Sequence, residues 1–243
     1  MQKIITNLEK NLKNFFQKRS IKKAVLGVSG GVDSAVTLKL AVNALGKENV
    51  FALLMPYDKF SSSENLNDAL KLVKKMKVDF QKIELSPFIK PFLSLDFINK
   101  KITKGNTLAR LRMNLLYAAA NEMQGMVLGT CNKTEILIGF FTKFGDGGAD
   151  LEVIGDLWKS EVFTLAESLD LKKFAHKKPT AELWDNHFDE QELGLSYQQI
   201  DQILKKIIKT KNFKPQNLIE KKVLSLFKNS EHKRITIPVI KSR

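Results

Sequence analysis

The chain has 243 residues, a formal net charge of +14 and a single cysteine. One cysteine excludes an intrachain disulfide and is typical of a reducing compartment, so we expect a cytoplasmic location. No segment approaches the roughly 20 apolar residues that a membrane helix needs, so we expect no membrane partner. The length suits one α/β domain, or one with a helical appendage.

The positive charge is concentrated near the end of the chain, where residues 201–243 hold 12 Lys and Arg against 3 Asp and Glu. Lysine supplies most of this excess, which is typical of solvated helix faces. Nucleic-acid surfaces usually interleave arginine with aromatic residues, and arginines here are few and scattered. We therefore expect no nucleic-acid partner, whereas a phosphorylated small molecule fits the charge.

Strands and helices alternate along the first two thirds of the chain. Helical spacing predicts an amphipathic N-terminal helix within residues 1–20. Short apolar runs predict strands at 24–28, 50–55, near 80–85 and at 126–130, and helices at 33–45, 64–76 and 108–123. This order predicts an α/β fold with a doubly wound parallel sheet flanked by helices, with ligands bound at the strand C-termini. We expect one domain, with a nucleotide-binding core at 23–155 and a mostly helical part at 156–243.

A glycine-rich segment separates the first predicted strand from the helix that follows. It reads Gly27, Val28, Ser29, Gly30, Gly31, Val32, Asp33, Ser34. Glycines let the backbone approach a ligand, and the amides at a helix start favour an anion. Ser29 and Ser34 add hydroxyl donors, while Asp33 would repel phosphate unless a cation lay between them. The segment therefore predicts an ATP phosphate loop with Asp33 as a Mg²⁺ ligand; a glycine-rich turn without a ligand is the alternative.

Two better-known phosphate loops do not match this segment. The Walker motif needs Gly-Lys before Ser or Thr, where Val32 and Asp33 stand. The dinucleotide fingerprint, if begun at Gly27, would need glycine at positions 29 and 32. The pattern S-G-G-x-D-S instead resembles the loop of the N-type ATP pyrophosphatases, whose fold is adenine nucleotide alpha hydrolase-like. That resemblance implies cleavage of ATP between its α and β phosphates and adenylation of a substrate.

Three downstream blocks narrow the resemblance. They span residues 105–113, 129–135 and 139–150, and together they closely resemble the NAD synthetase family. Further matches are Lys159 and the segments 179–181, 189–194 and 230–234, so the resemblance runs from about residue 23 to 238. Val32 and Glu182 depart from the residues common in the family, which affects fine positioning.

The resemblance implies amidation of deamido-NAD by ammonia, with ATP as co-substrate, Mg²⁺ as cofactor, and NAD, AMP and pyrophosphate as products. Thr130, Lys159 and Thr180 match ATP contacts beside the loop. Contacts with deamido-NAD match Arg110, Lys143, Asp150, His232 and Lys233. Glu135, just past a predicted strand, is the expected second Mg²⁺ ligand, although an exposed helix-start carboxylate is the alternative. Asp33, Asp150 and Lys159 are the expected catalytic residues, and Asp150 is our hypothesis for the proton acceptor.

The family also implies a homodimer, with the N-terminal helix and the aromatic segment 140–150 as candidate interface elements. Free ammonia is the expected nitrogen donor. The loop begins by residue 27, which leaves no room before it for a glutamine-hydrolysing domain, and Cys131 lies inside the synthetase part, where we interpret it as a packing residue.

Two other interpretations compete. A tRNA-thiolating enzyme of the same loop class is slightly favoured by the charge, but such enzymes usually need catalytic cysteines. A non-catalytic adenine-nucleotide sensor would leave Lys143, Asp150, His232 and Lys233 without a role.

Overall fold

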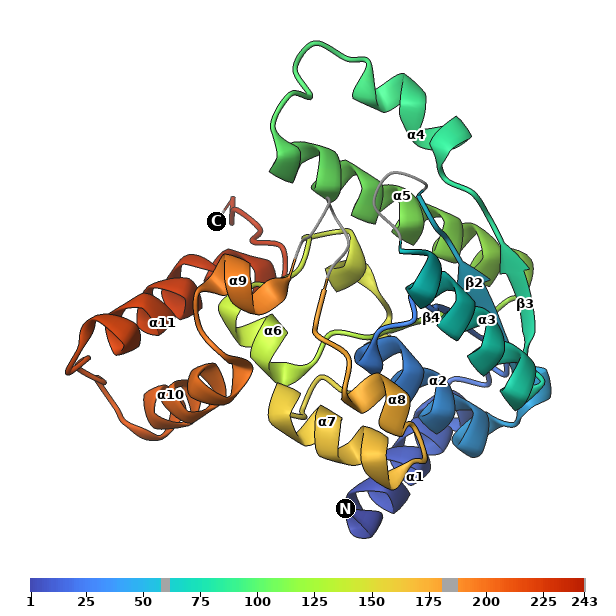
Figure 1. The fold of residues 1–243 in the computed structure, drawn as a ribbon, viewed down its shortest axis with the longest axis horizontal. Coiled ribbons are helices and arrows are strands. Elements are labelled where there is room, and N and C mark those ends of the chain that lie inside the picture. Colours follow the sequence, from blue (N-terminus) through green and yellow to red (C-terminus); the bar gives the residue numbers. More distant parts are fainter. Residues whose placement is uncertain (58–61, 181–187, 243) are drawn as a thin grey trace.

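The computed structural model describes residues 1–57, 62–180 and 188–242, so Glu182 lies outside the described residues. Its centre is a five-stranded, all-parallel sheet of order β3-β2-β1-β4-β5 (Figure 1). The strands are β1 (Ala24–Gly27), β2 (Val50–Leu54), β3 (Asp79–Lys82), β4 (Met126–Gly129) and β5 (Leu151–Glu152). The predicted doubly wound parallel sheet is confirmed. β1 lies between β2 and β4, so the order reverses there, which is where such sheets bind ligands.

Helices cover both faces of the sheet and build the end of the chain. In order they are α1 (Gln2–Lys18), α2 (Val32–Leu45), α3 (Ser63–Met76), α4 (Ser86–Leu93), α5 (Lys101–Glu122), α6 (Lys133–Ile138), α7 (Lys159–Ser168), α8 (Lys172–Ala175), α9 (Asp189–Leu193), α10 (Tyr197–Lys209), α11 (Leu218–Asn229) and α12 (Glu231–Arg234). Short 3₁₀ turns lie at Lys47–Asn49 and Asp146–Gly148. None of the helices in the described ranges has the length and hydropathy to cross a bilayer.

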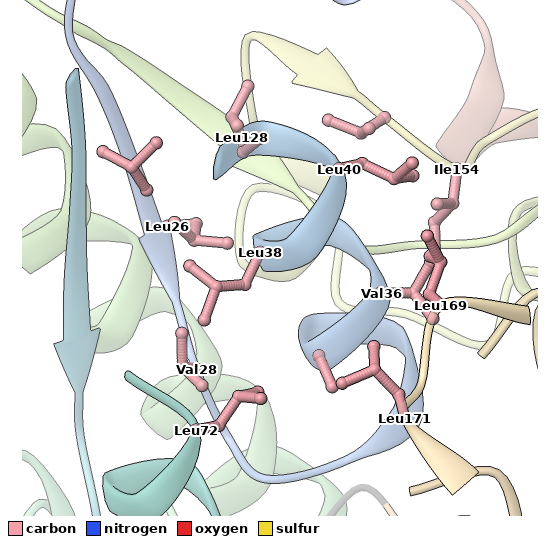
Figure 2. Packing of buried hydrophobic residues seen from close by; sticks show 14 of the residues in the cluster. Leu26, Val28, Val36, Leu38, Leu40, Leu72, Leu128, Ile154, Leu169 and Leu171 are labelled. Atoms are coloured by element: carbon pink, nitrogen blue, oxygen red, sulfur yellow. The ribbon is translucent and has the colours of Figure 1, made fainter. Parts of the chain in front are cut away.

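The alternation of side chains along the central strands divides the core in two. Leu26 and Leu128 pack with α1, α2, α3 and α7 in the larger cluster (Figure 2). Val25 and Val127, one residue earlier on each strand, face α4 and α5 in a second cluster. Each buried aliphatic side chain of this kind contributes about 1.5–3 kcal/mol. Because both faces are covered, the strand sequences are almost wholly apolar.

The α5 helix begins at Lys101, seven residues before the predicted start at residue 108. Gly105 has a poor helix propensity, but it is buried inside the helix. Helix α4 was not predicted, because its sequence contains Pro87 and Pro91. Pro87 stands at the helix start, where a missing N–H is tolerated, and the buried Ile89 anchors the helix to the core. The third strand ends at Lys82, earlier than predicted.

The C-terminal helices α9–α12 gather to one side of the sheet (Figure 1). Their own apolar cluster is centred on Tyr197, Ile200 and Leu204 of α10, and Ile138 of α6 packs into it. Helix α10 also packs against α7. The C-terminal part is therefore joined to the carboxyl edge of the sheet through α6 and α7, the helices that carry candidate site residues.

Candidate active site

The predicted phosphate loop, residues 27–34, connects β1 to α2 and has glycine where the backbone requires it. Gly30 has φ +88°, and a Cβ there would lie 2.1 Å from the carbonyl oxygen of Asn65 in α3. The hydroxyls of Ser29 and Ser34 bond to groups of the loop itself: the amide of Gly31 donates to Ser29 Oγ at 3.2 Å, and Ser34 Oγ donates to the Gly31 carbonyl at 3.0 Å. An anion bound at the start of α2 would accept hydrogen bonds from these hydroxyl and amide groups in place of the internal bonds.

A cavity of about 480 Å³ opens along the carboxyl edge of the sheet, in front of this loop. Most of the ATP and metal residues predicted from the sequence line it: Gly27, Val28, Ser29, Gly31, Val32, Asp33, Ser34, Thr130, Glu135, Lys159 and Thr180. Of the residues predicted to contact deamido-NAD, Lys233 lines it as well. The fold thus gathers segments from distant regions of the chain around one space large enough for a nucleotide.

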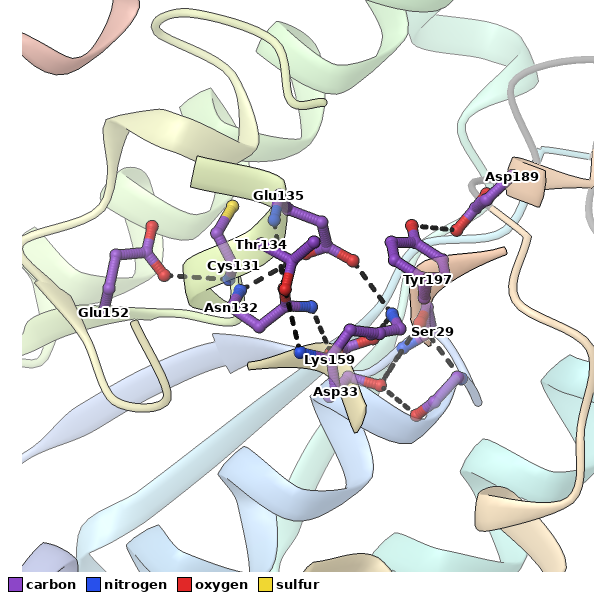
Figure 3. Close-up of polar contacts among 12 residues, drawn as sticks. Ser29, Asp33, Cys131, Asn132, Thr134, Glu135, Glu152, Lys159, Asp189 and Tyr197 are labelled. Atoms are coloured by element: carbon purple, nitrogen blue, oxygen red, sulfur yellow. Dashed lines mark hydrogen bonds and ion pairs between the residues drawn. The ribbon is translucent and has the colours of Figure 1, made fainter. Parts of the chain in front are cut away.

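The Lys159 ammonium lies between the carboxylates of Asp33 and Glu135 (Figure 3), and all three residues line the cavity. Its Nζ is 2.6 Å from Oδ2 of Asp33 and 2.9 Å from Oε1 of Glu135, and its side chain is 2% exposed. Burial alone would lower the pKa of this ammonium, but the two carboxylates outweigh burial and raise the pKa above its ordinary value. Lys159 therefore remains charged. Burial raises the pKa of Glu135 to about 7, against the opposing effect of Lys159.

A second layer of contacts holds Lys159 in place. Its backbone amide donates to Thr134 Oγ1 at 2.9 Å, and the Tyr197 ring lies 4.9 Å from its ammonium. Thr134 Oγ1 donates to Asp201 of α10, whose other oxygen accepts from the amide of Ser160. This buried network makes α10 part of the support for the lysine.

Asp33 and Glu135 present the oxygen ligands that Mg²⁺ prefers. Within the described ranges no group of three or more His, Cys, Asp or Glu side chains could hold a metal by itself. That suits Mg²⁺, which usually takes one or two carboxylates and completes its shell with water and substrate phosphates. The ammonium of Lys159 already lies between the two carboxylates. The pair therefore accommodates a positive charge at this point.

Four residues predicted to contact the second substrate are linked beside the cavity. Arg110 Nε donates to the carbonyl of Lys143, and Lys143 Nζ donates to the carbonyl of His232 at 2.6 Å. Lys233 Nζ donates to the carbonyls of Gly139 and Phe141 at 2.6 and 2.7 Å. These bonds attach the short helix α12 to the segment that follows α6, and they concentrate positive charge there.

Comparison with known proteins agrees with this geometry. The NAD synthase family model matches residues 4–237. The chain belongs to the NAD synthase family. The NH(3)-dependent NAD(+) synthetase of Archaeoglobus fulgidus is 41% identical over 90% of this chain and 88% of its own length.

Solved structures agree over the whole chain. The NMN synthetase from Francisella tularensis superposes with a TM-score of 0.90 at 34% identity, covering 100% of this chain and 98% of that one. The NH3-dependent NAD synthetase from Campylobacter jejuni superposes with a TM-score of 0.83 at 30% identity, covering 99% of both chains.

Asp150 is the third predicted catalytic residue of this NAD synthase family member, and it is placed differently from the other two, Asp33 and Lys159. It is exposed and is not among the residues that line the cavity. Its Oδ1 accepts from the Tyr117 hydroxyl at 3.0 Å and its Oδ2 accepts from the Val127 amide at 2.8 Å. Both carboxylate oxygens therefore accept hydrogen bonds from the α5–β4 side. Burial, and after it Asp150, raises the pKa of Tyr117 to about 12.

Three residues that contact or support Asp33 and Lys159 were not predicted to have a role. Asn132 Nδ2 donates to Asp33 Oδ1 at 2.9 Å, and Tyr197 and Asp201 support Lys159 from α10. Asn132 carried a signal, because an Asn followed three residues later by Glu135 forms a capping box at the start of α6. Tyr197 and Asp201 resemble ordinary positions in an amphipathic helix, so nothing in the pattern set them apart.

Proposed function

We propose that this member of the NAD synthase family amidates deamido-NAD with ammonia, at the expense of ATP, to give NAD, AMP and pyrophosphate. The observation that carries the proposal is the Asp33–Lys159–Glu135 cluster at the phosphate loop. It supplies a cation and two metal-binding carboxylates where an anionic substrate must meet anionic phosphates. Relatives named NH(3)-dependent NAD(+) synthetase support the same reaction.

In the first step, an oxygen of the nicotinate carboxylate forms a bond to the α-phosphorus of ATP. The bond from that phosphorus to the bridging oxygen breaks, and pyrophosphate leaves with the electron pair. The loop amides and Ser29 bind the phosphates, while Lys159 neutralises charge as it builds up. A Mg²⁺ ion bound by Asp33 and Glu135 would supply further charge neutralisation.

In the second step, ammonia attacks the activated carbonyl, a carbon–nitrogen bond forms and AMP leaves with the electron pair of the cleaved carbon–oxygen bond. Ammonium has no lone pair, so a proton must be removed before attack, and a second leaves as the amide forms. We propose Asp150 for this proton transfer, although it stands outside the residues that line the cavity and its oxygens accept from Tyr117 and Val127. Asp150→Asn should slow amide formation while ATP–pyrophosphate exchange continues; unchanged kcat with normal deamido-NAD binding excludes the role.

The chain's own chemistry supports ammonia as the direct nitrogen donor. A glutamine-hydrolysing site uses a cysteine nucleophile, and Cys131 is unsuited to it. The thiol is buried, and burial raises its pKa well above the ordinary value, with Glu152 adding to the shift. A thiol in that state provides little thiolate. The single cysteine also argues against the tRNA-thiolating alternative and supports a reducing, cytoplasmic setting.

We also propose a homodimer, and we place its interface away from α1, one of the two elements expected. Helix α1 buries Ile5, Leu12 and Phe16 against its own chain. Large exposed apolar side chains occur instead on α4 and on the segment between α4 and α5: Phe88, Phe92, Leu95 and Phe97. Such a patch is unusual on a monomer. Phe92→Asp and Phe97→Asp together should lower the mass measured by sedimentation; an unchanged mass removes this face from consideration.

One incubation tests the function. Purified protein with ATP, Mg²⁺, ammonium and deamido-NAD should yield NAD, AMP and pyrophosphate in equal amounts, and omission of any component should stop the reaction. ATP binding without pyrophosphate release would instead indicate a nucleotide sensor. Nicotinate mononucleotide belongs in a parallel reaction, because the Francisella tularensis structure with the TM-score of 0.90 is an NMN synthetase. The larger kcat/KM identifies the preferred substrate.

A further inference from the structure

Lys177, just beyond α8, contacts three segments at once. Its Nζ lies 2.6 Å from Oδ2 of Asp68, donates to Oδ1 of Asn65 at 2.6 Å, and reaches the carbonyl oxygen of Gly30 at 3.4 Å. Its side chain is 16% exposed and lines the large cavity. Lys177 was not among the residues predicted from the sequence, although it contacts the phosphate loop at Gly30.

The first turn of α3 forms the wall that Lys177 joins to the loop. Asn65 lies so close to Gly30 that a Cβ on the glycine would meet its carbonyl oxygen at 2.1 Å. Ser62 caps this helix by accepting from the Asn65 amide at 3.0 Å. The ammonium therefore sits at a fixed point where α3, the loop and the segment after α8 meet.

The charges of this wall favour an anion. Asp68 is 3% exposed and forms ion pairs with two lysines. Its Oδ1 lies 2.5 Å from Nζ of Lys173, and its Oδ2 lies 2.6 Å from Nζ of Lys177. Glu64 of α3 also acts on Lys173, so Lys173 has a second carboxylate near it besides Asp68. Lys173 is 57% exposed and does not line the cavity, so of the two lysines that pair with Asp68 only Lys177 presents its ammonium to the cavity.

The loop needs such a cation. The β and γ phosphates of ATP carry most of its charge, and pyrophosphate gains a further negative charge as it leaves. Lys159 is already held by Asp33 and Glu135 at 2.6 and 2.9 Å, on the α7 side of the loop. Lys177 approaches from the α3 side, through the carbonyl of Gly30. A charge-assisted bond from this side would complement the loop amides.

We propose that Lys177 binds the β and γ phosphates of ATP, and then the departing pyrophosphate, while Asp68 and Asn65 hold its ammonium beside the phosphate loop. This assignment rests on the proposed adenylation reaction. When the substrate oxygen bonds to the α-phosphorus, the electron pair of the cleaved phosphorus–oxygen bond goes to pyrophosphate. Lys177 stabilises that group, so its replacement should affect ATP and pyrophosphate but not the nicotinate substrate.

The matched pair Lys177→Met and Lys173→Met tests the proposal. Each variant removes one lysine from Asp68, and of the two only Lys177→Met removes a cation from the cavity. Lys177→Met should raise the KM for ATP and the dissociation constant of inorganic pyrophosphate by about ten- to hundredfold, the effect of losing one charged hydrogen bond. The KM for deamido-NAD should stay unchanged. Lys173→Met should change none of these constants, and Lys177→Arg should recover most of the affinity.

Equal effects of the two methionine variants on ATP, or full pyrophosphate affinity in Lys177→Met, would overturn the assignment. Thermal unfolding checks that each variant folds, and Lys177→Gln provides a second, less apolar replacement. Calorimetric titration of the intact protein with pyrophosphate needs no turnover. If the wild type bound pyrophosphate but formed no NAD, the proposed amidation would be wrong, whereas the proposed phosphate site at Lys177 would still hold.

Discussion

Asn132 donates a hydrogen bond from Nδ2 to Oδ1 of Asp33 at 2.9 Å, and its own Oδ1 accepts from the amide of Glu135 at 3.0 Å. One fully buried side chain thus connects the two residues whose carboxylates are proposed to bind Mg²⁺. It also caps α6, so the helix start and the proposed metal site depend on the same amide group.

Asn132→Ala should therefore have two effects. Loss of the cap should lower the free energy of unfolding by about 1 kcal/mol. Release of Asp33 should raise the Mg²⁺ concentration needed for half-maximal activity. Asn217→Ala is the matched control, because Asn217 caps α11 by accepting from the Glu220 amide at 2.9 Å, away from the cavity. If both variants show the same Mg²⁺ dependence, Asn132 is only a cap.

Lys159→Met should make stability depend strongly on Mg²⁺. Without the ammonium, Asp33 and Glu135 are two largely buried carboxylates with no cation between them, and breaking such a buried pair costs about 3–5 kcal/mol. Added Mg²⁺ should raise the melting temperature of the variant more than that of the wild type. Lys75→Met removes an exposed ion pair with Asp170 and should change stability by less than about 1 kcal/mol. A variant that melts like the wild type without Mg²⁺ would contradict the prediction.

Glu152→Gln should alter the pH dependence of stability. Burial raises the pKa of Glu152 from its ordinary 4.5 to about 8. Between these values the folded chain binds a proton that the unfolded chain releases, so the free energy of unfolding falls as pH rises through this window. The amide oxygen of glutamine can still accept from the Cys131 amide, as Glu152 does at 2.9 Å. The variant should match the wild type in acid and be more stable above pH about 8.

Thermal melts across pH check this, with Glu122→Gln, an exposed carboxylate on α5, as the control. A wild-type curve that is flat between these two pKa values would show that Glu152 is ionised throughout.

The nitrogen donor can be tested by turnover. Ammonium should support NAD formation, and its kcat/KM should rise with pH while ammonia replaces ammonium, since ammonia carries the reactive lone pair. Glutamine should give no product with the purified chain. Cys131→Ala should leave the rate of the ammonium reaction intact and should lower stability slightly, because a buried side chain is shortened. Turnover with glutamine but not with ammonium would reverse the assignment.

The sequence predicted the parts of the fold that depend on local pattern. Buried parallel strands are continuous apolar runs, and the predicted β1, β2 and β4 end within a residue of the observed strands. Gly30 and Asp33 marked the phosphate loop because a glycine turn with one carboxylate, at a strand–helix junction, suits a phosphate and its metal ion. Helix α4 was missed because Pro91 inside it disfavours a helix, and tertiary packing of Ile89 outweighed that preference.

Contacts between distant segments could not be predicted. Asp33 and Lys159 form an ion pair across 126 positions, and a residue pattern alone gives no distance between them. The roles of Asn132 and Lys177 follow from geometry that appears only when α3, α6 and α8 surround the loop. Asp150 stands in a family block, and only the fold shows its carboxylate bonded to Tyr117 and Val127.

The hydrogen bond between Thr134 and Asp201 makes the position of Lys159 depend on the C-terminal helices. Asp201 lies on α10, whereas Thr134 and Ser160 belong to the helices that border the cavity. Exchange of the C-terminal helices with those of a relative would bring a new residue opposite Thr134. Such a chimaera would fold its sheet and phosphate loop yet lose the alignment of Lys159 unless the aspartate came with it. Asp201 in the C-terminal part of the chain thus helps to position Lys159, through Thr134 and the amide of Ser160.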